Sequence, residues 1–156
     1  MNRFIDSIGK ITNLTLFLLV FLILFDTLNR YLFSSGSIAL QELEWHLFDI
    51  VILFSVSYTL LYNRNVKVDL FYENLSEKWR DRVDLFSHLL FIAPFSIVVA
   101  IYSYDFAYLS YQQMESSSSA GGLQYRFIVK SLITVGFSML FVLSISQATK
   151  KISKIF

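Results

Sequence analysis

Apolar residues come in four long blocks, separated by shorter polar stretches. The blocks cover about residues 11–33, 47–62, 85–111 and 127–146. Each approaches the roughly 20 residues that a helix needs to cross about 30 Å of hydrocarbon, and a spanning helix satisfies its own backbone hydrogen bonds. The pattern predicts an all-α membrane protein with four transmembrane helices, forming a single integral membrane domain over residues 1–156.

The polar stretch between the second and third blocks has a periodicity of its own. Over about residues 66–82, apolar side chains recur every three or four positions and charged side chains fill the rest of the turn. This predicts an amphipathic helix that lies in the membrane interface between helices 2 and 3. Its expected anchors are Arg64, Phe71, Leu75 and Trp79. The alternative is a plain connection with an early start to the third span.

Composition agrees with a membrane protein. The chain is 55% hydrophobic, 17% aromatic and only 16% charged, unlike a soluble domain. Cysteine is absent, which excludes disulfides, thiolate metal sites and cysteine nucleophiles. The net charge of +1 offers no basic face for nucleic acid. Neither a phosphate-binding loop, a metal-ligand spacing nor a Ser-His-Asp order occurs, so we predict no enzyme and no cofactor. Pro94 is expected to kink the third helix.

The distribution of lysine and arginine predicts the orientation. Most basic residues precede the first block, lie between the second and third, or follow the fourth: Arg3, Lys10, Arg64, Lys67, Lys78, Arg80, Arg82, Lys150, Lys151 and Lys154. Only Arg30, Arg126 and Lys130 lie near the other two connections. The positive-inside rule therefore predicts that both termini and the central loop are cytoplasmic. The basic start lacks a small-residue cleavage site, so the first block is expected to be an uncleaved span.

Acidic residues within the blocks need partners. Asp26 lies deep in the first block, where an uncompensated carboxylate would cost several kcal/mol. We expect it to pair with Arg30, one turn later, or with another helix. Asp49 and Asp105 lie in the second and third blocks. Intramembrane acids can mark ion pathways, but contacts between helices or with a partner subunit are the favoured interpretation.

Two histidines and a pair of basic residues are further candidates. Two histidines could ligate a haem, but His46 opens the second span and His88 lies in the first turns of the third. The predicted topology therefore places them at opposite depths. Arg126 and Lys130 lie one turn apart at the start of the fourth span. They need an anionic partner such as lipid phosphate, Glu115 or an acidic subunit, or they snorkel to the headgroups.

Several motifs in order resemble a known family. Asn29-Arg30-Tyr31 closes the first span, Glu42-Leu43-Glu44-Trp45 opens the second, residues 63–70 read NRNVKVDL, and residues 115–137 read ESSSSAGGLQYRFIVKSLITVGF. Together they resemble the DctQ-like small membrane subunit of tripartite ATP-independent periplasmic (TRAP) transporters, over nearly the whole chain. Asn65 replaces the usual histidine of the third motif, whereas Lys67 and Asp69 keep its charges. Gln124 and Thr134 stand where one branch of the family usually has proline.

The resemblance implies a three-part, sodium-coupled secondary transporter in a bacterial or archaeal inner membrane. A periplasmic binding protein captures an organic anion, such as a dicarboxylate or sialic acid, and a large membrane subunit carries the substrate and sodium sites. The small subunit packs against the large one as a scaffold, and its interfacial segment would anchor it among membrane lipids.

On this interpretation, structural or interface roles are expected at Asp26, Arg30, Glu42, Trp45, Lys67, Asp69, Arg126 and Lys130. The alternative is a self-contained four-helix membrane protein. It would be either a small homodimeric exporter, with Asp26 as its membrane-embedded acid, or a haem-bearing electron-transfer subunit.

Overall fold

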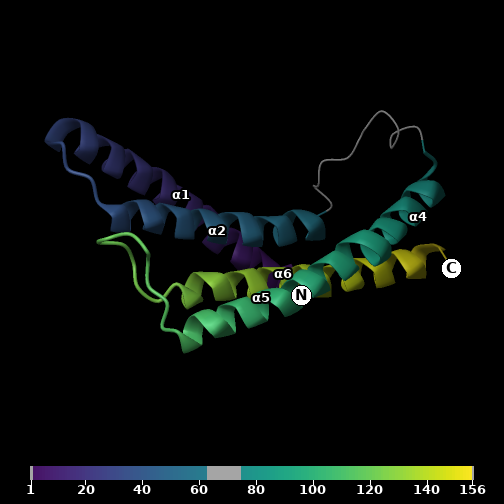
Figure 1. Ribbon diagram of the computed structural model, residues 1–156. Coiled ribbons are helices and arrows are strands. Elements are labelled where there is room, and N and C mark those ends of the chain that lie inside the picture. Colours follow the sequence, from purple (N-terminus) through teal and green to yellow (C-terminus); the bar gives the residue numbers. More distant parts are fainter. Residues whose placement is uncertain (1, 63–74, 156) are drawn as a thin grey trace.

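The described part of the chain consists mostly of long helices. The computed structural model describes residues 2–62 and 75–155. Its helices are α1 (Asn2–Phe33), α2 (Ile38–Leu61), α4 (Glu77–Ser87), the π-helical turn η1 (His88–Ile92), α5 (Ala93–Gln112) and α6 (Phe127–Ile155) (Figure 1). Because α4, η1 and α5 follow one another without a break, they form one long helix.

The prediction of an all-α protein with four spans is confirmed. Four helices in the described ranges are long and apolar enough to cross a membrane: Asp6–Phe33, Ile38–Leu61, Glu77–Gln112 and Phe127–Ile155. These helices extend beyond the apolar blocks, because helical backbone hydrogen bonding continues through the polar residues that flank each block. α2 thus begins well before residue 47, behind an N-cap in which Ser37 accepts a hydrogen bond from the Leu40 amide at 3.4 Å.

The connection between the second and third spans is only partly described. From Glu77 onward the chain is α4, an amphipathic helix continuous with the third span. For residues 77–82 the structure therefore has the early start of the third helix. The separate interfacial helix stays a prediction for residues 66–74. Those residues lie outside the described part of the chain, as do the predicted anchors Arg64 and Phe71 and the motif residues Lys67 and Asp69.

The helices pack as two pairs, and the two pairs meet where α2 contacts α6. α5 packs along α6, α1 along α2, and α2 also contacts α6. The connections 34–37 and 113–126 lie at the same end of the bundle, here called the loop end (left in Figure 1). The end of α2, the start of α4 and the end of α6 lie at the opposite end, the terminal end. Leu60, Leu140 and Leu143 form the buried apolar cluster between the pairs.

The distortion expected at Pro94 takes the form of a π-helical turn. η1 ends just before this proline, which lies in the first turn of α5. Proline has no amide hydrogen to donate and its ring crowds the preceding turn, so widening of the helix there is a common response. The backbone of the third span is thus locally widened without being interrupted.

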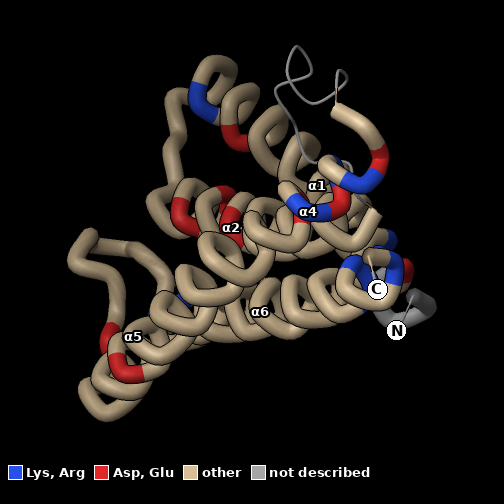
Figure 2. The backbone as a smooth tube through the Cα atoms, turned by 90° about the vertical axis from the view of Figure 1, so that its right-hand side faces the viewer, with Lys and Arg blue, Asp and Glu red and all other residues tan. Residues whose placement is uncertain are grey.

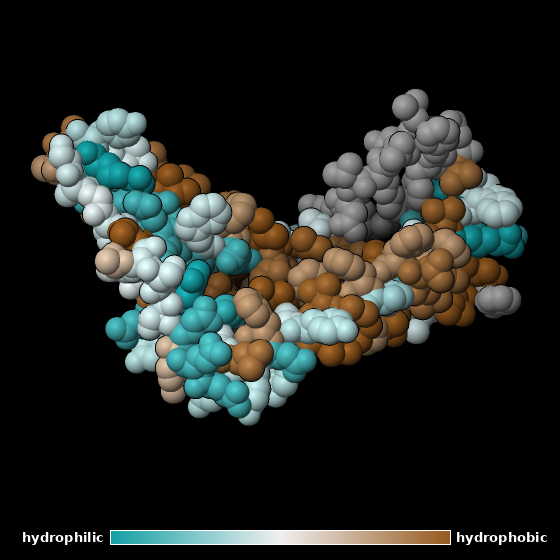
Figure 3. Space-filling view, in the orientation of Figure 1, coloured by the Kyte–Doolittle hydropathy of each residue, from teal (hydrophilic) through white to brown (hydrophobic). Residues whose placement is uncertain are grey.

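Much of the apolar surface of the bundle is uncovered. Phe17 and Phe21 of α1 are 68% and 64% exposed, and Phe91 and Phe95 of the third span are 62% and 60% exposed. Apolar residues cover the middle of the bundle, and hydrophilic residues gather at the loop end (Figure 3). Lysine and arginine gather at α4 and beside the C-terminus (Figure 2). Such an apolar belt fits lipid or another membrane helix as its environment.

Candidate functional site

Glu42 ties the long connection of the loop end to α2. One oxygen of its carboxylate accepts a hydrogen bond from the Ser117 hydroxyl, and the other accepts one from the Leu123 amide at 2.6 Å. The Ser117 amide in turn donates to the Leu123 carbonyl at 2.9 Å. Both ends of the Ser-rich turn are therefore held against one carboxylate.

Two positions of this connection, 121 and 122, require glycine for different physical reasons. Gly121 has a φ of 82°, a conformation that glycine adopts without penalty. A Cβ on Gly122 would lie 2.4 Å from the Cβ of Ser117 and 2.8 Å from a Glu42 oxygen. Gly122 therefore allows the close approach on which the Glu42 tie depends.

Lys130 and Arg126 take different roles. Lys130 forms an ion pair with Glu115 and lies 3.9 Å from the centre of the Phe106 ring. The hydrogen bond from Lys130, and the positive charges of Lys130 and Arg126, hold the pKa of Glu115 below its usual value. The expected anionic partner of Lys130 is thus Glu115, whereas the Arg126 amide donates to the Glu115 carbonyl at 3.0 Å.

A cavity between α2 and the start of α6 brings four of the predicted site residues together. Its volume is about 420 Å³, and it is lined by Glu42, Trp45, His46, Asp49, Arg126, Val129 and Lys130. Its acidic residues, Glu42 and Asp49, come from α2, whereas its basic residues, Arg126 and Lys130, lie just before α6 and in its first turn, so the cavity has charged groups of both signs. Trp45 is 67% exposed at its rim.

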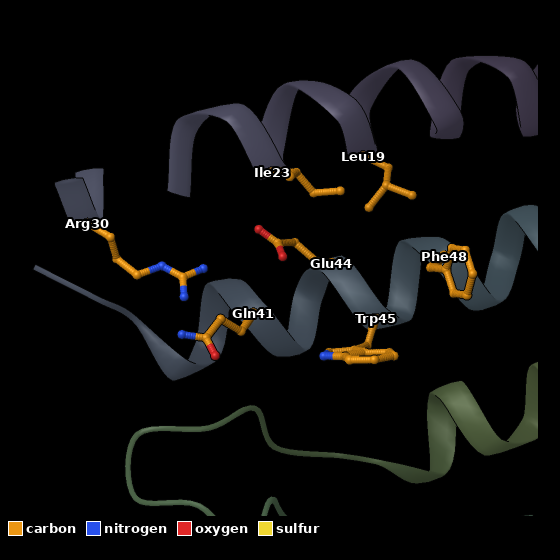
Figure 4. A pocket seen from close by; sticks show the side chains of 7 residues that line it. All are labelled: Leu19, Ile23, Arg30, Gln41, Glu44, Trp45 and Phe48. Atoms are coloured by element: carbon orange, nitrogen blue, oxygen red, sulfur yellow. The ribbon is translucent and has the colours of Figure 1, made fainter. Parts of the chain in front are cut away.

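A second cavity lies between α1 and α2 (Figure 4). Its volume is about 300 Å³, and its lining includes Arg30 from α1 and Gln41, Glu44 and Trp45 from α2. Arg30 donates to Asp26, which is completely buried. The predicted pairing of Asp26 with Arg30 is therefore confirmed. Glu44 was not singled out from the sequence, although it belongs to the motif around Trp45.

The terminal end carries ties that local sequence patterns did not reveal. Lys151 of α6 forms ion pairs with Asp81 and, at 2.9 Å, with Asp84 of α4. The Gln147 side-chain amide donates to the Leu61 carbonyl at 2.8 Å, which caps the end of α2. These partners are 67 to 86 residues apart in the chain. No spacing rule on one helix could have found them.

The remaining candidates occupy separate positions. Trp79 is 56% exposed and Arg82 lies 5.0 Å from the centre of its ring, while Leu75 is partly buried just before α4. His46 lines the cavity of α2 and α6, whereas His88 is buried in η1 with Ser144, whose hydroxyl donates to the His88 carbonyl at 3.0 Å. Across residues 2–62 and 75–155, no group of three histidine, cysteine or carboxylate side chains could hold a metal ion.

Comparison with known proteins identifies a family. The sequence pattern described as "Tripartite ATP-independent periplasmic transporters, DctQ component" matches residues 19–154. No curated protein matches the chain. In TRAP transporters generally, the DctQ component works with a large membrane subunit and a periplasmic binding protein. It is a transporter component and not an enzyme, which favours the transporter subunit over an exporter or a haem protein.

The four helices of the described residues that are able to cross a membrane agree with a multi-pass inner-membrane protein. Since the match covers nearly the whole chain, this protein belongs to the DctQ family and is the small membrane subunit of a TRAP transporter.

Proposed function

We propose that this subunit is a static scaffold for the large subunit of a sodium-coupled transporter. The complex would take up an organic anion, a carboxylate such as a dicarboxylate or a sialic acid, delivered by the periplasmic binding protein of a bacterium or archaeon. The observation that carries the proposal is that polar ties join different helices at both ends of the bundle.

These ties suit a part that keeps its shape while its partner moves. At the loop end, Glu42 holds the connection between α5 and α6 against α2. At the terminal end, Lys151 joins α6 to α4, and Gln147 joins α6 to the last turn of α2. Because ion pairs and hydrogen bonds strengthen where water is scarce, ties at both ends would oppose sliding and tilting of the helices.

The transported anion would bind elsewhere in the complex. Substrate and ion sites of secondary transporters are usually built from helices interrupted near the middle of the membrane. In the described part of this chain each candidate span is continuous, and the π turn before Pro94 stays helical. This supports a substrate path within the large subunit.

The charge distribution supports an orientation. Lysines of the C-terminal region and the basic residues of α4 lie at the terminal end, whereas Arg30, Arg126 and Lys130 lie near the loop end. The positive-inside rule then places the terminal end in the cytoplasm and the loop end in the periplasm. The loop-end cavity with Arg126 and Trp45 would face the binding protein, while Arg64 and Lys67 would lie among cytoplasmic headgroups.

An engineered crosslink tests the static role. The Ser103 and Thr134 hydroxyls of α5 and α6 lie 3.0 Å apart, and the chain has no native cysteine. In Ser103→Cys/Thr134→Cys, paired with a cysteine-free large subunit, oxidation would lock the two helices together. We expect unchanged sodium-driven uptake in liposomes, with the single variants as controls. Uptake that oxidation abolishes and reduction restores, in the double variant alone, would refute a static scaffold.

A reconstitution without this chain tests whether a scaffold is needed. Liposomes would carry the large subunit with the binding protein added, with or without the small subunit. We expect uptake only in the complete system and only under an inward sodium gradient. Equal uptake without this chain would show that the large subunit needs no scaffold.

A further inference from the structure

The cavity between α1 and α2, taken together with the buried Asp26 beside it, carries more negative than positive charge. Among its lining residues only Arg30 and Glu44 are charged, and Arg30 already pairs with the buried Asp26. Two carboxylates thus face one guanidinium, which leaves one negative charge without compensation when both are ionised. Both carboxylates lie on helices that are long and apolar enough to span a membrane, and an uncompensated charge within a membrane is costly.

The hydrogen bonding of these carboxylates is also incomplete. One oxygen of Asp26 and one oxygen of Glu44 are inaccessible to solvent and have no hydrogen-bond partner among the described residues. A buried acceptor without a donor is destabilising, and such groups call for a physical explanation. Figure 4 shows the Glu44 carboxylate between the two helices, directed toward α1 with the Arg30 guanidinium on the same side of the cavity.

We infer that this cavity receives one basic side chain from a membrane helix of the large subunit, whose cationic group pairs with Glu44 beside the Asp26–Arg30 pair. This inference rests on the proposed function, since it presumes that the large subunit lies against α1 and α2. The incoming cation would balance the local charge and supply the missing donors.

The rim of the cavity fits a helix carrying that side chain. Trp45 is 67% exposed and Phe48 is 44% exposed on α2, and Ile23 of α1 is 42% exposed on the opposite wall. An apolar helix packed over these side chains would cover them while its basic residue enters the cavity. The site therefore combines an apolar contact with one specific charge pair.

Two other occupants fit the charges less well. A zwitterionic lipid has an amine, but its phosphate would bring a second negative charge close to Glu44 and Asp26. A second copy of this chain could offer its own Arg30, but that guanidinium would leave Asp26 buried without its cation. A basic side chain of another protein brings the needed charge without either cost.

An isosteric substitution separates a cationic partner from simple protonation of the acid. Glu44→Gln keeps the shape of a protonated glutamic acid but cannot form an ion pair. The matched control is Glu77→Gln, which makes the same change at an exposed position at the start of α4, at the terminal end of the bundle. Each variant would be co-purified with the large subunit in mild detergent, and its affinity measured by titration.

We expect Glu44→Gln to weaken the complex by about tenfold to a hundredfold, while Glu77→Gln binds like wild type. Equal binding by Glu44→Gln, with wild type assembling normally, overturns the inference and leaves the proposed function intact. A wild-type chain that captures no large subunit overturns both.

Crosslinking and charge exchange keep the test valid if Glu44→Gln folds poorly. A photoreactive amino acid at position 48 should crosslink to one helix of the large subunit, identified by mass spectrometry. Replacing the basic residue of that helix with glutamate should break the complex, and Glu44→Lys in this chain should restore it. Crosslinks only to lipid or to a second copy, or no rescue by the exchange, would overturn the inference.

Discussion

The seam of α5 with α6 and the seam of α1 with α2 bury their residues at the same spacing but end differently. Both buried stripes follow steps of three, four or seven positions, which keep to one face of a helix: Ala93, Ser96, Ala100, Ser103 and Ser110 on α5, and Thr12, Thr15, Leu19 and Asp26 on α1. The α5 stripe consists only of small residues, which let two backbones approach closely. The α1 stripe ends in a buried carboxylate beside a cavity.

The two seams also differ in how their buried polar side chains are hydrogen-bonded. On α5, Ser96 and Ser103 donate to carbonyls of their own helix, at 2.6 Å and 3.1 Å, and Ser103 also lies 3.0 Å from Thr134 across the seam. On α1, Asp26 keeps an unpartnered oxygen although its neighbour Arg30 contacts the other. Small residues close the first seam, here called the closed seam, and leave one hydroxyl of the stripe, that of Ser110, without a partner among the described residues. In the second, here called the open seam, the group that lacks a partner is a carboxylate oxygen, and our inference assigns its missing cation to another subunit.

The largest effect is expected from overfilling the closed seam. Ala100→Leu adds three carbons at a position that is 5% exposed on α5. Because small residues set the distance between the helices, we expect a loss of about 3 kcal/mol, the upper end for overpacking. Thermal unfolding in detergent measures it. The control Val98→Leu, at a 49% exposed position of the same helix, should behave like wild type. Equal stability of both variants would mean that the seam is not tightly packed.

The open seam should respond to loss of its cation. Arg30→Met keeps much of the side-chain bulk but leaves buried Asp26 without its only described partner. We expect a loss of about 2 kcal/mol, within the range for an orphaned buried acceptor. The double variant Arg30→Met/Asp26→Leu should recover most of it, since removing both partners costs less than removing one. Unfolding of the four chains gives the coupling energy, and strict additivity would contradict the pair.

The sequence alone predicted the four spans and one contact at the seam of α1 with α2, the pairing of Asp26 with Arg30. Asp26 and Arg30 lie four residues apart on one helix, so their pairing follows from helical geometry. Lys151 with Asp84, and Glu42 with Leu123, join residues 67 and 81 positions apart. Those contacts depend on how helices pack, and helices that are apolar nearly all round give no pattern from which to infer it. Glu44 was missed for the same reason, because its importance lies in the cavity beside it.

A middle effect is expected at the contact that bridges the two pairs of helices. Gly122→Ala places a methyl group against Ser117 and a Glu42 oxygen, so the connection must move away from α2. We expect a loss of about 1 kcal/mol, as for a glycine whose replacement does not fit. Limited proteolysis after Tyr125, together with thermal unfolding, measures it. Gly121→Asn is the control, because asparagine tolerates the left-handed backbone there. Greater protease sensitivity in the control would contradict a special role for Gly122.

The smallest effect concerns acid at the loop end of the closed seam. The pKa of Glu115 is lowered, chiefly by the hydrogen bond from Lys130, so the folded state favours its ionised form. A group with a lowered folded pKa contributes stability above its unfolded pKa, and that contribution fades as the pH falls through the folded pKa. Wild type should therefore be slightly more stable than Glu115→Gln at neutral pH, and the two melting temperatures should converge in acid. Because Glu115 is partly exposed, salt should shrink the gap as well. A gap that persists unchanged in acid and in salt would mean that Glu115 acts through packing instead of charge, and that the closed seam needs no ion pair at its end.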